Sequence, residues 1–114
     1  MYDNMLDLNI STPEDYVKVF DALSHPIRIK ILGLLAKERQ YVSELARIVN
    51  ISRPLLYMHL KKLETAGFIT GHAEISSSGK AIKYYESLNF EITINPPLLT
   101  KLSENIEIKT SHLN

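Results

Sequence analysis

Hydroxyl, guanidinium and ammonium groups gather between residues 52 and 62, at a spacing that suits contact with double-stranded DNA. A guanidinium such as that of Arg53 can pair with both acceptors of a guanine in the major groove. The Ser52 hydroxyl and the ammonium groups of Lys61 and Lys62 suit phosphate oxygens, which position a protein without reading sequence. The full set of predicted DNA-contacting residues is Ser52, Arg53, Pro54, Tyr57, Met58, His59, Lys61, Lys62 and Lys80.

Four of these residues also have a simpler interpretation. Arg53 could be a solvated surface arginine, and Tyr57 either touches a base or phosphate or packs against its own helix. His59 lies beside the expected apolar face, so it is either a hydrogen-bonded, partly buried histidine or a phosphate contact. Lys80 stands in a predicted turn, where it contacts phosphate or the minor groove, or simply keeps the turn soluble.

Two helices across a tight turn would position this stretch. The first is expected at about residues 43–49, and Asn50 is suited to the left-handed conformation that ends a helix. Ser52 is a natural N-cap for the second, which ends before Gly67. Apolar residues recur at helical spacing on its inner face, namely Leu56, Leu60 and Leu63. This arrangement predicts a helix-turn-helix, whose second helix enters the major groove.

The flanking segments predict further helices and a hairpin. Capping residues before Pro13 and Pro26 start two helices. Either Ser24 or His25 is expected to cap the second of these helices. Its basic residues Arg28, Lys30 and Lys37 are expected to face away from the core. Residues 38–40 are read as a loop. Strand-like residues 68–75 and 81–88 flank a turn of serines and glycine, and residues 90–94 suggest a third strand or an extended segment. A last helix begins near residue 96, and residues 103–114 are expected to be frayed.

These elements predict a mainly α fold with a small β-hairpin (α+β), a winged helix-turn-helix. At 114 residues the chain has room for one such core. The expected divisions are an extension at 1–12, the winged helix-turn-helix at 13–95 and a carboxyl-terminal segment at 96–114. That last segment is assigned to dimerisation, followed by the frayed tail.

The charge distribution agrees with a DNA-binding surface. The net charge is zero, but residues 25–83 carry ten basic and four acidic side chains, a net of +6. The preceding segment is −4 and the following one −2. Positive charge therefore concentrates around the helix-turn-helix, as expected for a phosphate-binding surface.

Several other classes of function have little support in the sequence. The chain lacks cysteine, and its four histidines form no i, i+4 pair, so we expect no metal site and no cofactor. It has no phosphate-binding glycine loop and no catalytic Ser/His/Asp pattern, which argues against an enzyme. No apolar run is long enough for a membrane span, and no signal peptide is recognisable. We expect a cytoplasmic protein without a membrane partner.

Five short motifs together resemble those of arsenic-repressor-type (ArsR-like) winged-helix regulators. They are ALSHPIRIKIL at 22–32, SELA at 43–46, SRP at 52–54, HLKKL at 59–63 and AGFI at 66–69. The resemblance covers roughly residues 14–88. The short form, with its extended segment after the wing, looks more like archaeal members. The resemblance implies a homodimeric prokaryotic transcription regulator that binds operator DNA, often as a repressor.

The sequence departs from that family in three places. Metal-sensing members carry cysteines around positions equivalent to Tyr41-Val42-Ser43, where this chain has none. The carboxyl-terminal region lacks the closely spaced Asp and His of the other metal site, and Tyr57 replaces a small serine. These differences argue against metal sensing and against an inherited operator sequence, and they leave any small-molecule effector unknown.

More apolar residues occur near the two ends than one small core needs. We expect them to form a two-fold dimer interface, composed of Tyr16, Val17, Phe20, Leu98, Leu99 and Leu102. The competing function is a winged helix that packs on a protein partner, which exposed Leu55 and Met58 would favour.

Overall fold

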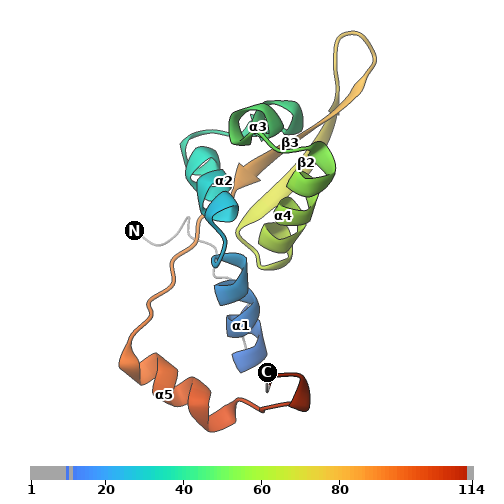
Figure 1. Ribbon diagram of the computed structural model, residues 1–114. Coiled ribbons are helices and arrows are strands. Elements are labelled where there is room, and N and C mark those ends of the chain that lie inside the picture. The colour runs from blue at the N-terminus through green and yellow to red at the C-terminus, as the bar shows by residue number, and fades with distance from the viewer. Residues whose placement is uncertain (1–9, 11, 113–114) are drawn as a thin grey trace.

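A computed structural model describes residue 10 and residues 12–112 (Figure 1). The predicted extension therefore lies almost entirely outside the described residues. The elements follow the order α1 (Pro13–Ala22), α2 (Pro26–Lys37), β1 (Gln40–Tyr41), α3 (Val42–Val49), α4 (Arg53–Thr65), β2 (Ile69–Ile75), β3 (Ala81–Ser87), α5 (Pro96–Asn105) and a 3-10 turn at Thr110–His112. The described fold is a winged helix-turn-helix, as the sequence predicted.

Side-chain caps fix where most of the helices begin. Thr12 and Asp15 form a reciprocal capping box at α1, and the His25 ring accepts a hydrogen bond from the Ile27 amide at α2. Ser52 and Asn95 cap α4 and α5 in the same way. Each of these four helices has proline in its first two positions, where the missing N–H leaves no hydrogen bond unmade.

The turn between α3 and α4 has the predicted geometry. Asn50 adopts the left-handed conformation with φ 61° and ψ 50°, and its amide donates to the Ala46 carbonyl at 2.8 Å. Gly67, with φ 92°, follows the end of α4. Residues 50–52 therefore form the tight turn that sets α4 across α3.

The sheet has the strand order β1-β3-β2, with both pairings antiparallel. Gln40 pairs with Tyr85 and Ile75 with Ala81, which places β1 at the base of the wing and the serine-rich turn at its tip. The prediction of a loop at residues 38–40 was thus wrong at Gln40. Residues 90–94 form an extended segment, the second of the two predicted options. Phe90 nevertheless packs edge-on against Phe68, with ring centroids 4.6 Å apart.

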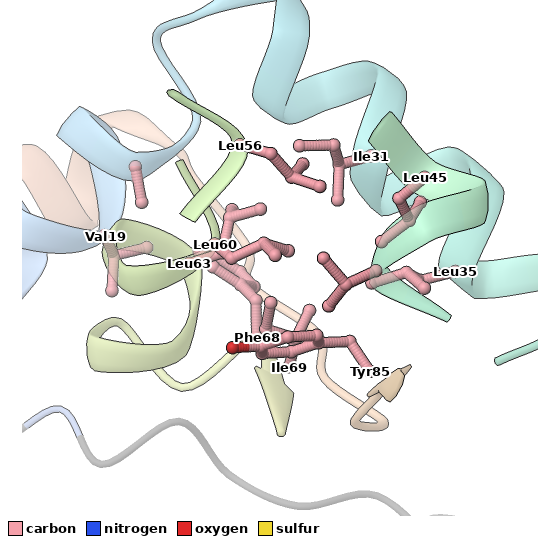
Figure 2. Packing of buried hydrophobic residues seen from close by; sticks show 12 residues of the cluster. Val19, Ile31, Leu35, Leu45, Leu56, Leu60, Leu63, Phe68, Ile69 and Tyr85 are labelled. Carbon is pink, nitrogen blue, oxygen red and sulfur yellow. The ribbon is translucent and has the colours of Figure 1, made fainter. Parts of the chain in front are cut away.

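The hydrophobic core lies between the helices and the inner face of the sheet (Figure 2). Leu56, Leu60 and Leu63 are fully buried, as predicted. In α1 the buried residues are Val19 and Ala22, whereas Val17 is 49% exposed. Helix α1 therefore packs on the body through Val19 and Ala22 and leaves Val17, a residue predicted for the dimer interface, exposed.

Helix α5 stands apart from this core. It contains no buried residue, and an extended connector carries it away from the sheet toward the start of α1 (Figure 1). It continues through Asn105, so the prediction of fraying from residue 103 was wrong for its last turn. None of the described helices is both long and apolar enough to span a membrane.

Candidate nucleic-acid interface

One face of α4 is buried and the opposite face is exposed. The three leucines of the inner face have no exposed surface, while Tyr57 is 40% and Met58 64% exposed. The other exposed side chains of this helix include Arg53, Lys61 and Lys62. The structure therefore brings five of the predicted contact residues onto one accessible surface, which we call the α4 face.

Arg53 lies at the amino-terminal end of α4, beside the wing. It lines a hollow together with Gln40, Ser43 and Lys83, which come from β1, the start of α3 and β3. Ser52 and Pro54, also exposed, flank it. An arginine in this position is open to solvent at the end of the helix that a helix-turn-helix directs toward base edges.

Lys83 joins the α4 face from the wing and was missed by the sequence analysis. Its ammonium lies 5.9 Å from the Tyr57 ring centroid and 5.2 Å from that of Tyr85, within the range of cation–π attraction. The neighbouring Tyr85 side chain also raises the pKa of Lys83, so this lysine is charged at neutral pH. Tyr57 thus touches the wing while remaining partly exposed.

Lys61 and Lys62 differ in their surroundings. Lys62 Nζ forms a 3.1 Å ion pair with Asp21 Oδ2 of α1. Lys61 forms no ion pair with any described residue and is exposed. Lys61 is therefore the better placed of the two for an external anion, because Lys62 would have to leave its partner.

Arg28 and His59 are the main corrections to the predicted surface. Arg28, expected to face away from the core, is only 8% exposed. Its Nε donates to the Ala22 carbonyl at 2.8 Å and Nη2 to the Asp21 carbonyl at 3.0 Å, while Nη1 lies 3.1 Å from His59 Nδ1. These acceptors at the end of α1 draw the guanidinium inward.

His59 is the acceptor that links this arginine to α4. It is 5% exposed, so the hydrogen-bonded interpretation is confirmed and direct contact of its side chain with DNA is not supported. Its ring centroid is 4.6 Å from that of His25. Burial is the main cause that lowers the pKa of His59, and electrostatic repulsion from His25 and Arg28 lowers this pKa further. The neutral ring is therefore favoured.

The wing has a polar tip and an aromatic base. Lys80 is exposed at the end of the turn, where its amide donates to the Ser76 hydroxyl. At the base, Tyr84 stacks on His72 and meets the edge of Tyr41, with ring centroids 5.1 and 5.9 Å away. The wing is therefore anchored at its base and open at its tip.

The predicted interface residues divide into two groups. Tyr16, Leu98 and Leu102 line one hollow of about 260 Å³ between α1 and α5. Val17 and Leu99 are half exposed outside it, and Phe20 packs partly against the core. The first group is brought together by the fold, while the second remains spread over both helices.

Within the described part of the chain, no three His, Asp or Glu residues gather closely enough to hold a metal ion.

Comparisons with known proteins agree with this geometry. The model of the bacterial regulatory protein arsR family matches residues 25–70. An uncharacterized HTH-type transcriptional regulator of Methanocaldococcus jannaschii is 40% identical over 91 residues, covering 80% of this chain and 95% of the relative. The HTH-type transcriptional repressor SmtB of Mycobacterium tuberculosis is 36% identical over 63 residues, covering 55% of this chain and 44% of the repressor.

A solved structure with a similar fold is the homodimeric winged helix-turn-helix DNA-binding domain from Mycobacterium bovis. Its TM-score is 0.54 at 23% identity, covering 65% of this chain and 64% of that one. Together, the family match and the relative aligned over almost its whole length show that this chain belongs to the ArsR family of winged helix-turn-helix transcriptional regulators.

Proposed function

We propose that the protein is a sequence-specific DNA-binding transcription regulator that acts as a homodimer. Residues 52–66 would enter the major groove, and the wing at 68–88 would contact the flanking backbone or minor groove. The observation that carries this proposal is the α4 face, where basic and aromatic side chains are exposed on a helix whose opposite side is anchored in the core.

The contacts on this surface would have different roles. Arg53, with Tyr57 and Met58 one turn later, would approach base edges, because the amino-terminal end of a recognition helix reads the groove. Ser52, Lys61 and the wing residue Lys80 would bind phosphates. Pro54 would fix the start of the helix. Lys83 lies against Tyr57 and is added to the DNA-contacting residues that the sequence predicted.

The dimer proposal rests on apolar surface that one chain leaves exposed. Helix α5 has no buried residue, although its sequence contains Leu98, Leu99 and Leu102. Exposed apolar residues of this kind mark interaction surfaces when they lie together. We propose that α1 and α5 pair with the same helices of a second copy. The homodimeric state of the M. bovis domain supports dimerisation itself. Residues 13–95 would then be the DNA-binding unit and 96–114 the dimerisation segment.

Selection from random duplex DNA, followed by footprinting, tests binding and specificity together. The expected result is a two-fold site whose half-sites lie about 10 base pairs apart, or a multiple of that. A monomer at micromolar concentration by sedimentation, with and without DNA, would contradict the dimer. Failure to enrich any sequence would contradict specific recognition.

Three single substitutions separate base reading from phosphate binding. Arg53→Ala should cost about 1–3 kcal/mol on the selected site and relax preference at one base position. Lys61→Ala should weaken selected and random DNA alike and reduce the salt slope by about 0.9. Lys30→Ala removes an exposed lysine from α2, outside the α4 face, and serves as the control. If Arg53→Ala weakens every duplex equally, Arg53 binds phosphate only.

The same measurements test the competing protein-interaction role. Leu55 and Met58 are 37% and 64% exposed, and a partner could cover them. A module of that kind would show no salt-dependent DNA affinity traceable to Lys61 and would lose its partner on Met58→Asp.

A further inference from the structure

A cavity of about 400 Å³ lies between α1 and α4, away from the hollow between α1 and α5. Its volume falls within the range of small-molecule sites in proteins. The walls come from Lys18 and Asp21 of α1, Arg28 of α2, and Met58, Lys61 and Lys62 of α4. Side-chain methylenes and the Met58 thioether make its surface mainly apolar.

The charged groups around this cavity are strongly unbalanced. Lys18, Arg28, Lys61 and Lys62 oppose only Asp21, and the Asp21 carboxylate is already paired with Lys62. The remaining basic groups therefore surround an apolar space without a matching negative charge from the lining residues.

Among these basic residues, Arg28 carries a positive charge that is buried, where an unbalanced charge is energetically unfavourable. The residue is more than nine-tenths buried, yet the hydrogen-bond partners of its guanidinium are two carbonyls and the His59 ring. No carboxylate of a described residue forms an ion pair with it. Because a guanidinium has five N–H groups, each terminal nitrogen retains a second N–H beyond the bond described. A buried cation without a counter-ion favours binding of an anion beside it.

We propose that this cavity binds a small organic anion, with an apolar body against Met58 and a carboxylate or phosphate directed to Arg28 and Lys18. A guanidinium fork suits both oxyanions. The two headgroups share this chemistry, and the binding test separates them.

Such a ligand would be coupled to DNA binding, a step that rests on the proposed function. Met58, Lys61 and Lys62 belong both to the cavity wall and to the α4 face. A lysine that neutralises the bound anion is less available to a DNA phosphate. Occupancy should therefore lower DNA affinity, and DNA should lower ligand affinity by the same factor.

NMR titration of the isotope-labelled full chain, without DNA, tests the site itself. The probes are phenyl phosphate and benzoate, compared with benzyl alcohol and inorganic phosphate. We expect saturable shifts at the amides of Thr65 and Ala66, which also line the cavity, and at Arg28 Nε. At least one aromatic anion should bind about tenfold or more tightly than both controls, since hydrogen bonds to charged groups are strong. The better headgroup identifies the anion class.

Two variants test whether the aromatic anions bind in this cavity. Arg28→Met should weaken the aromatic anion about tenfold or more. Because loss of this buried arginine could unfold the protein, Thr65→Leu provides a second test: it fills the cavity wall from an exposed position and should abolish saturation. Thr100→Leu makes the same change on exposed α5 and should leave binding unchanged.

Equal binding of the aromatic anions and either control, absence of saturable shifts at the cavity, or normal binding by Thr65→Leu would overturn the proposal. Since the titration contains no DNA, each of these outcomes leaves the DNA-binding proposal to its own test.

Discussion

Protonation of His59 should destabilise the fold, and the effect is specific enough to measure. The ring is 5% exposed, and its Nδ1 accepts from Arg28, so a proton there would remove an acceptor and place two cations together. Burial, His25 and Arg28 lower the pKa of His59 below its ordinary value of 6.5. The unfolded chain therefore binds a proton at a higher pH than the folded one.

The sign and the size of the effect follow from this difference. Between the lowered folded pKa and 6.5, unfolding takes up a proton, so the free energy of unfolding falls as the pH falls. The contribution is fully present above 6.5 and is lost as the pH falls through the folded pKa. Its slope cannot exceed about 1.4 kcal/mol per pH unit, the value for one proton.

Urea unfolding followed by circular dichroism, from about pH 7.5 to about pH 5, measures this slope. The control is His59→Asn, which retains an acceptor near Nδ1 but does not titrate. The stability advantage of the original protein over the variant should shrink through the acidic range by up to about 1.4 kcal/mol per pH unit. Parallel curves for the two proteins would refute the reasoning, because other titrating groups are common to both.

Three further predictions concern the core, the turn and metals. Leu60→Ala should lower the free energy of unfolding by about 2–5 kcal/mol, measured by urea unfolding; a loss as small as that of the exposed Leu55→Ala would show that Leu60 is not a core residue. Asn50→Ala should cost about 1–2 kcal/mol because of its left-handed φ of 61°, and Asn50→Gly should avoid that steric cost. Zinc, cadmium or arsenite should leave DNA affinity unchanged in a binding titration, and a loss reversed by chelator would contradict this expectation.

Local chemistry accounts for the part of the fold that the sequence predicted. The caps at Ser52 and His25 act through groups two or three residues away, and the three leucines of α4 follow a strict helical spacing. Such signals need no knowledge of distant segments. They sufficed to place the helix-turn-helix, the wing hairpin and the exposed side of α4.

The errors involve partners that are distant in the chain or patterns too short to recognise. Arg28 looked like a surface residue because one of its partners, His59, is 31 positions away. Strand β1 has only two residues, so it shows no alternation, and its pairing with β3 crosses more than forty positions. Lys83 joined the α4 face through the same kind of long-range contact.

Strand β1 also has a mechanical consequence. Tyr41 ends β1, directly precedes the first residue of α3 and donates a 2.5 Å hydrogen bond to Glu74 of β2. No flexible linker separates the base of the wing from the helix-turn-helix, so a force applied to the wing is transmitted directly to α3. We expect the wing and α3 to move as one rigid unit. A duplex that contacts both the wing and the helix-turn-helix would have to bend to fit the fixed angle between them. The cost of a mismatch in shape would then fall on the DNA, whose stiffness depends on its sequence.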